Sequence, residues 1–108
     1  MTQAKFIYVT APDRATAIAI ARALVEKRLA ACVNVLPGVS SVYRWKGAVE
    51  TAEEVALIVK TSTGPLAAAI AEIKRRHPYE TPAISAFEVF PEEETLQWIC
   101  DETAQFHE

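Results

Sequence analysis

Residues 31–59 read ACVNVLPGVSSVYRWKGAVETAEEVALIV, and this stretch decides the fold. Its first part, Ala31 to Leu36, is rich in β-branched residues and predicts a strand. Pro37-Gly38 breaks that strand, which resumes from Ser40 to Trp45. Lys46-Gly47 then predicts a tight turn, so the stretch as a whole indicates a long β-hairpin.

The return arm of the hairpin and the N-terminal segment supply three more elements. The hairpin returns through Glu50 to Glu54 into Val55 to Val59, a continuous apolar run that is typical of a strand covered on both faces. Phe6 to Thr10 is rich in aromatic and β-branched residues and predicts a first strand. Asp13 is placed to cap a helix whose apolar residues recur at helical spacing down to Arg28.

The C-terminal half repeats the alternation of helix and strand. Thr63-Gly64-Pro65 opens a second helix, with the proline at a position that helices tolerate. Ala83 to Phe90 predicts a further strand. A short helix from Pro91, with three acids at Glu92 to Glu94, ends the series.

The order of these elements predicts the architecture. Two βαβ-like halves, about residues 4–45 and 54–90, favour an α+β, ferredoxin-like βαββαβ fold, in which an antiparallel sheet carries two helices on one face. We expect residues 1–108 to form a single domain with an added C-terminal helix. That helix is too short to hide the second face of the sheet, and Val42, Tyr43 and Trp45 would be costly to leave in water, so we expect self-association.

Charge and composition exclude several classes of partner. The net charge of -3 and the pI of about 5.4 give no electrostatic case for binding nucleic acid. Apolar runs fall short of the roughly 18 residues that a membrane span needs, and residues 1–5 show no signal-peptide pattern, so we expect a cytoplasmic protein without a membrane partner. In that reducing compartment, Cys32 and Cys100 are expected to be thiols.

Two basic clusters, Lys27-Arg28 and Lys74 to Arg76, resemble an anion-binding patch at first sight. Each falls in the last turn of a predicted helix, where cations complement the helix dipole. We therefore attribute both clusters to the helix ends and predict no phosphate site from them.

The segment His77-Pro78-Tyr79-Glu80-Thr81-Pro82 places an imidazole, a phenol and a carboxylate between two prolines. Each proline fixes its own φ and keeps the preceding residue out of the helical region, so the segment should be extended and stiff, with His77 exposed. On the residues alone, a segment that ends a helix and aims the next strand is favoured over a binding edge.

The chain resembles the CutA (divalent-cation tolerance) family from end to end. The matching segments stand in the family's order: Leu29 to Asn34, Pro37-Gly38, Ser41 to Gly47, Glu50, Glu54, Lys60-Thr61 and His77 to Pro82. The resemblance implies a ferredoxin-like, CutA-like domain over residues 1–108. It also implies a tight homotrimer whose edge strands pair between subunits, and a non-enzymatic role in binding divalent metal ions such as Cu(II). For the segment from His77 to Pro82, the resemblance therefore favours a binding edge over a purely structural role.

The resemblance also implies candidate metal ligands. His77 matches the family's histidine ahead of Pro-Tyr, and imidazole is a good ligand for Cu(II) or another divalent metal. Glu80 is a second candidate, and Cys32 a third that the mid-strand pattern favours as a buried hydrophobe. Some bacterial members carry a further histidine and a further cysteine where this chain has Arg76 and Val9, so the ligand set here is smaller.

An alternative is a small-ligand module that resembles the PII signalling proteins and uses a cleft between subunits. The residues that could converge there are Tyr43, Trp45, Glu50, Lys60, His77, Tyr79 and Glu80. The three glycines lie far apart and form no phosphate loop, so we expect neither a nucleotide nor an organic cofactor. His77 and Glu80 could in principle act as a base and its orienting carboxylate, but we do not expect an enzyme.

Overall fold

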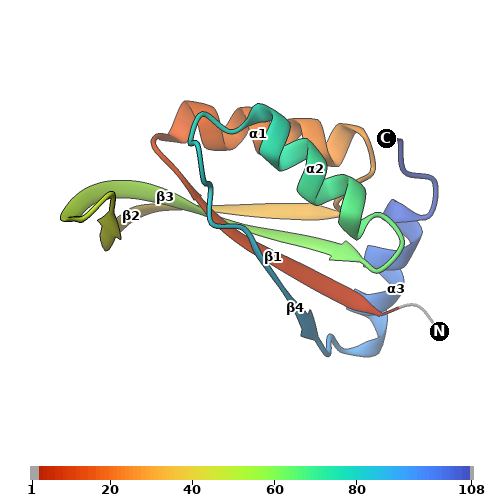
Figure 1. The fold of residues 1–108 in the computed structure, drawn as a ribbon. Helices are drawn as coiled ribbons and strands as arrows, with labels where there is room; N and C mark the ends of the chain where they lie inside the picture. Colours follow the sequence, from red (N-terminus) through yellow and green to blue (C-terminus); the bar gives the residue numbers. More distant parts are fainter. Residues whose placement is uncertain (1–2, 108) are drawn as a thin grey trace.

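The computed structural model describes residues 3–107 and contains four strands and three helices in this part of the chain (Figure 1). In chain order they are β1 (Ala4–Ala11), α1 (Arg14–Glu26), β2 (Cys32–Trp45), β3 (Ala48–Ser62), α2 (Leu66–Arg76), β4 (Ser85–Val89) and α3 (Glu93–Thr103). The strands pair antiparallel in the order β2-β3-β1-β4. The predicted α+β, ferredoxin-like βαββαβ fold is confirmed.

Helices α1 and α2 cover one face of the sheet (Figure 1). The alternation of β1 decides which residues face them: Ile7 and Val9 are buried, whereas Tyr8 between them is exposed. Leu57 and Val59 of β3 join the same core beneath these helices. The Asp13 carboxylate accepts a hydrogen bond from the Thr16 amide at 2.8 Å, so the predicted helix cap is confirmed.

The interruption predicted at Pro37-Gly38 is confirmed as a bulge in the β2–β3 pairing, after which β2 continues. Two other predicted boundaries were wrong. Helix α1 ends at Glu26, because Arg28 takes a left-handed conformation with φ 59° and reverses the chain. The last strand begins at Ser85, after Ala83 has also turned to a positive φ of 55°.

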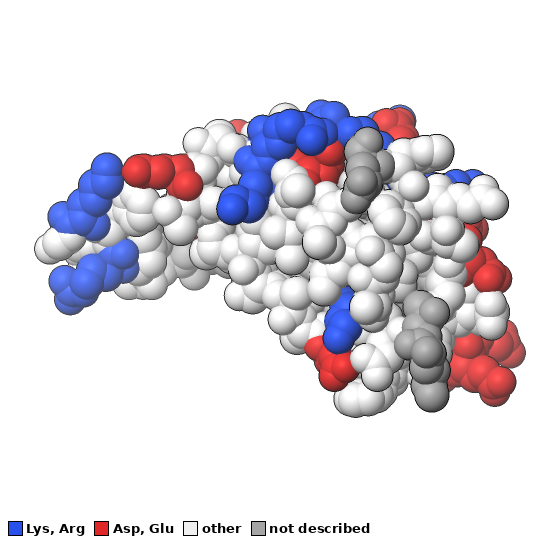
Figure 2. Space-filling model, turned by 45° about the vertical axis from the view of Figure 1, so that its right-hand side comes forward, with Lys and Arg blue, Asp and Glu red and all other residues white. Residues whose placement is uncertain are grey.

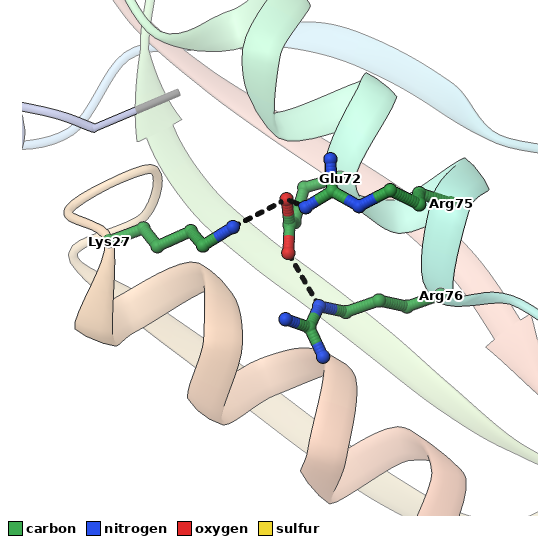
Figure 3. A network of polar contacts seen from close by, with 4 residues as sticks. All are labelled: Lys27, Glu72, Arg75 and Arg76. Carbon is green, nitrogen blue, oxygen red and sulfur yellow. Dashed lines mark hydrogen bonds and ion pairs between the residues drawn. The ribbon is translucent and has the colours of Figure 1, made fainter.

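Lys74 to Arg76 lie in the last turn of α2, as predicted, whereas Lys27 and Arg28 follow the end of α1. Glu72 on α2 brings members of the two basic clusters together. Its side chain is only 2% exposed, and its carboxylate contacts Lys27 Nζ at 3.1 Å and the guanidinium groups of Arg75 and Arg76 (Figure 3). Burial disfavours the charge, but these cations outweigh it and lower the pKa of Glu72 to about 2. Lys27 therefore joins α1 to α2. Figure 2 shows the basic side chains gathered over the helix layer.

The second face of the sheet is covered only in part. Near the chain ends α3 packs on it, with Ile99 buried and the hydroxyls of Ser62 and Thr103 2.7 Å apart. Farther along, large apolar side chains on this face and on the β2–β3 arm are exposed: Tyr8, Leu36, Phe87, Val42, Tyr43, Trp45 and Val49. The prediction that a terminal helix leaves part of the sheet uncovered is confirmed, whereas the homotrimer stays a prediction.

Among residues 3–107, no helix combines the length and the apolar character needed to cross a membrane.

Candidate functional site

His77 lies where α2 ends and the proline-flanked segment begins. Its amide closes the helix on the Ile73 carbonyl at 2.9 Å, and its own backbone is extended, as the following proline requires. The ring Nε2 lies 2.7 Å from the carbonyl oxygen of Thr10, and Nδ1 accepts a hydrogen bond from the Tyr79 amide at 3.1 Å. These contacts assign the proton to Nε2, which donates it to Thr10.

The expectation of an exposed His77 was wrong, because the side chain is only 8% exposed. The ring is drawn inward by its hydrogen bond to Thr10, which stands at the end of β1 and 67 positions away in the sequence. The imidazole thus ties the segment to the sheet. Only Nδ1 retains a lone pair, and a single amide bond occupies it.

Tyr79 and Glu54 extend this cluster toward the hairpin. The Tyr79 hydroxyl donates to Glu54 Oε2 at 2.7 Å, and its ring lies 4.7 Å from the His77 ring. Glu54 is buried in the middle of β3; burial disfavours its charge, but hydrogen bonds from Ser41 and Tyr79 lower its pKa. Burial and the adjacent Glu54 carboxylate raise the pKa of Tyr79. At neutral pH Glu54 is therefore ionised and the Tyr79 hydroxyl keeps its proton.

Glu54 was quoted as part of the sequence resemblance but was not proposed as a site residue. It directly precedes the apolar run from Val55 to Val59, where an acid should be buried at the start of a covered strand. The position of Glu54 just before this apolar run was the sequence signal that could have identified it as a buried, functional carboxylate. The Tyr79 partner lies 25 positions away and could not be read from local spacing.

Glu80 contacts the hairpin turn rather than the His77 cluster. Its carboxylate lies 3.5 Å from Lys46 Nζ, and both side chains are largely exposed. The same ammonium group lies 5.5 Å from the centre of the Trp45 ring. Glu80 is thus held by an exposed ion pair, which is a weak interaction that a ligand can replace.

Cys32 lies at the other end of β2 and is partly exposed. It stands opposite Lys60 in the sheet register, and Lys60 Nζ lies 5.6 Å from the centre of the Phe6 ring. In the arm, Tyr43 stands opposite Glu50 and Trp45 opposite Ala48.

The candidate residues therefore fall into separate groups within one chain. His77 and Tyr79 are together, Trp45 and Glu80 share Lys46, and Cys32 and Lys60 form a third group. In the part of the chain that the structure describes, no group of three or more His, Cys, Asp and Glu side chains is arranged to hold a metal ion.

We expect Tyr79→Phe to lower the free energy of unfolding by about 1–2 kcal/mol, because it leaves the buried Glu54 carboxylate without its phenolic donor. Urea unfolding of the two proteins at equal concentration measures the loss. Tyr8→Phe, at an exposed tyrosine of β1, is the matched control and should change stability by less than about 0.5 kcal/mol. An equal effect of both substitutions would contradict the role given to the Tyr79 hydroxyl.

Comparisons with known proteins agree on one family. The family model described as CutA1 divalent ion tolerance protein matches residues 5–102. A divalent-cation tolerance protein CutA of Thermus thermophilus is 42% identical over 98 residues, covering 90% of this chain and 95% of its own length. Its counterpart in Archaeoglobus fulgidus is 46% identical over 101 residues, with coverage of 93% and 97%. The crystal structure of CutA from Xylella fastidiosa superposes with a TM-score of 0.90 at 42% identity, covering 94% of this chain and 98% of that one.

Proposed function

Because this chain belongs to the CutA1 divalent ion tolerance protein family, we propose that it binds a divalent metal ion, copper above all, in the cell's response to metal. It does so as a homotrimer and without enzymatic activity. The family match over residues 5–102 is the observation that carries this proposal. The chemistry of His77 supplies the contact with the metal.

The hydrogen bonds of His77 favour Nδ1 as the ligating atom. Histidines that bind metals commonly donate their other ring N–H to a backbone carbonyl, which orients the ring, and the bond from Nε2 to Thr10 has this form. Nδ1 would hold the metal in place of the hydrogen bond that the Tyr79 amide donates to it. Glu80, three residues farther along the chain, would supply a carboxylate oxygen in place of its ion pair with Lys46.

Assembly supports the same function, because residues 3–107 of one chain do not bring three ligands together. A second subunit can supply the missing donors, and the exposed apolar face gives subunits a reason to associate. Cys32 lies partly exposed on β2 at the edge of the sheet, and its substitution tests whether it is a donor of this kind.

We expect His77→Ala to lose most of the Cu(II) binding of the wild-type protein in equilibrium dialysis, because it removes the imidazole ligand. Binding should also weaken in acid, since a proton competes with the metal for the ring nitrogen. Cys32→Ser is the comparison variant and should retain most of the binding. Thermal unfolding of both variants separates loss of a ligand from loss of the fold, because His77 is buried.

The ligand assignment fails if folded His77→Ala binds copper as well as the wild type while Cys32→Ser does not. Glu80→Gln distinguishes the carboxylate: weaker binding in this variant supports its role as second ligand. Unchanged binding would show that Glu80 does not bind the metal and pairs only with Lys46.

A further inference from the structure

The Tyr79 amide blocks the nitrogen of His77 that is left for a ligand. Nε2 is bonded to the Thr10 carbonyl at 2.7 Å, and Nδ1 accepts the hydrogen bond from the Tyr79 amide at 3.1 Å. Pro78 has no N–H, so Tyr79 carries the first backbone donor that follows His77 in the chain. The folded chain therefore holds the imidazole in a closed state, in which both ring nitrogens are hydrogen-bonded.

The side chain of Tyr79 determines how firmly its amide is held on His77. The two ring centres lie 4.7 Å apart, and the Tyr79 hydroxyl donates to Glu54 Oε2 at 2.7 Å. The residue is thus fixed at both ends, at the amide by His77 and at the hydroxyl by Glu54. When the amide leaves Nδ1, the bond at the hydroxyl opposes the movement.

Glu54 is a firm anchor because it belongs to the sheet. It is buried in β3, where it stands opposite Val39 and directly precedes Val55 of the core. Thr10 lies on the neighbouring strand β1, opposite Ala56 of β3. The two groups that hold the segment after α2, the Glu54 carboxylate and the Thr10 carbonyl, therefore come from adjacent strands of one sheet.

A second contact joins this segment to the hairpin turn, but it is weaker. Glu80 lies 3.5 Å from Lys46 Nζ, and the two side chains are 69% and 70% exposed, so solvent screens their attraction. A hydrogen bond from a phenol to a buried carboxylate contributes more than an exposed ion pair does. The bond between Tyr79 and Glu54 is therefore the main restraint on this part of the segment.

We propose that Glu54 acts through Tyr79 as a latch on His77: it keeps the Tyr79 amide on Nδ1 and so lowers the affinity of this site for a divalent metal ion. This inference rests on the proposed function and names how that same site is regulated. The imidazole is available only in chains whose Tyr79 amide has left Nδ1, so the apparent affinity falls in proportion to the fraction of such chains. Glu54 and Tyr79 are positioning residues, whereas His77 is the ligand.

Tyr79→Phe tests the latch, because it removes the hydroxyl and keeps the ring and the amide. Equilibrium dialysis at one neutral pH, below the unfolding temperature of every variant, compares the Cu(II) affinities. We expect Tyr79→Phe to bind Cu(II) about three- to tenfold more tightly than the wild type, which is the effect of one hydrogen bond. Tyr8→Phe, at the exposed tyrosine of β1, is the matched control and should bind as the wild type does.

A spectroscopic measurement on the metal-free protein detects the opened latch directly. The chain has two histidines, so a protein labelled with ¹⁵N at histidine gives few ring signals, and His77→Ala assigns those of His77. A nitrogen lone pair resonates at lower field when it loses a hydrogen bond. In Tyr79→Phe the Nδ1 signal should therefore move to lower field, whereas the Nε2 signal should stay, because the bond to Thr10 is untouched. A loss of stability alone would move neither signal.

The outcomes separate the latch from the proposed function. If Tyr79→Phe binds Cu(II) no more tightly than Tyr8→Phe while His77→Ala loses binding, the latch is overturned and the ligand stands. An Nδ1 signal that stays in place in Tyr79→Phe also overturns the latch. If folded His77→Ala binds Cu(II) as the wild type does, the ligand and the latch both fall.

Discussion

Glu72→Gln is expected to lower the free energy of unfolding by about 3 kcal/mol at neutral pH, because a buried carboxylate that balances three cations is removed. Lys27, Arg75 and Arg76 would then repel one another across the contact between α1 and α2. Urea unfolding at a fixed protein concentration measures the loss. Equal concentrations are needed because association contributes to apparent stability.

The same carboxylate gives stability a defined pH dependence. The pKa of Glu72 is about 2 in the folded protein, against an ordinary value of 4.5, so the unfolded chain takes up the proton first. The stabilisation from Glu72 is complete above about pH 5 and is lost as the pH falls toward 2. Glu72→Gln cannot titrate, and its stability should fall less steeply over this range.

Asp101→Asn is the matched control for this substitution. Asp101 is an exposed helical carboxylate that accepts a hydrogen bond from Gln97 at 2.8 Å, so its replacement should cost less than about 0.5 kcal/mol. A Glu72→Gln protein as stable as the Asp101→Asn protein would show that the cluster contributes nothing beyond surface ion pairs.

Trp45→Asp is expected to convert the proposed homotrimer into a monomer, with the mass in light scattering falling to that of the 11.9 kDa chain. Trp45 is 38% exposed in one chain and lies on the same face of the β2–β3 arm as Tyr43, which is also exposed. An aspartate in that apolar surface would be buried without a partner in the assembly, and the cost is several kcal/mol. The chain itself should still fold, because the side chain is outside its core.

Trp45→Phe is the matched control, since it keeps an apolar ring at the same place in the arm. It should remain a trimer at micromolar concentration, and circular dichroism should show the same helix and strand content in both variants. If Trp45→Asp keeps the trimer mass, the arm lies outside the interface. If the wild-type protein itself is a monomer, the exposed face needs another explanation.

Local signals in the sequence were sufficient for the elements and for their order. Lys46-Gly47 marks the hairpin turn because glycine tolerates the positive φ that it adopts there. Asp13 marks the start of α1 because a carboxylate can bond the amide of Thr16 three residues on. The order of strands and helices then left the ferredoxin-like sheet as the economical arrangement.

The sequence could not show which polar groups are buried, because their partners are distant in the chain. Glu72 is buried through Lys27, which lies 45 positions away, and His77 through Thr10, which lies 67 positions away. A charged or polar side chain is buried only where partners meet it, and folding alone decides which groups meet. The sequence by itself determined the fold and the candidate ligands, whereas the tertiary structure decided that Nδ1 of His77 is the nitrogen that keeps its lone pair.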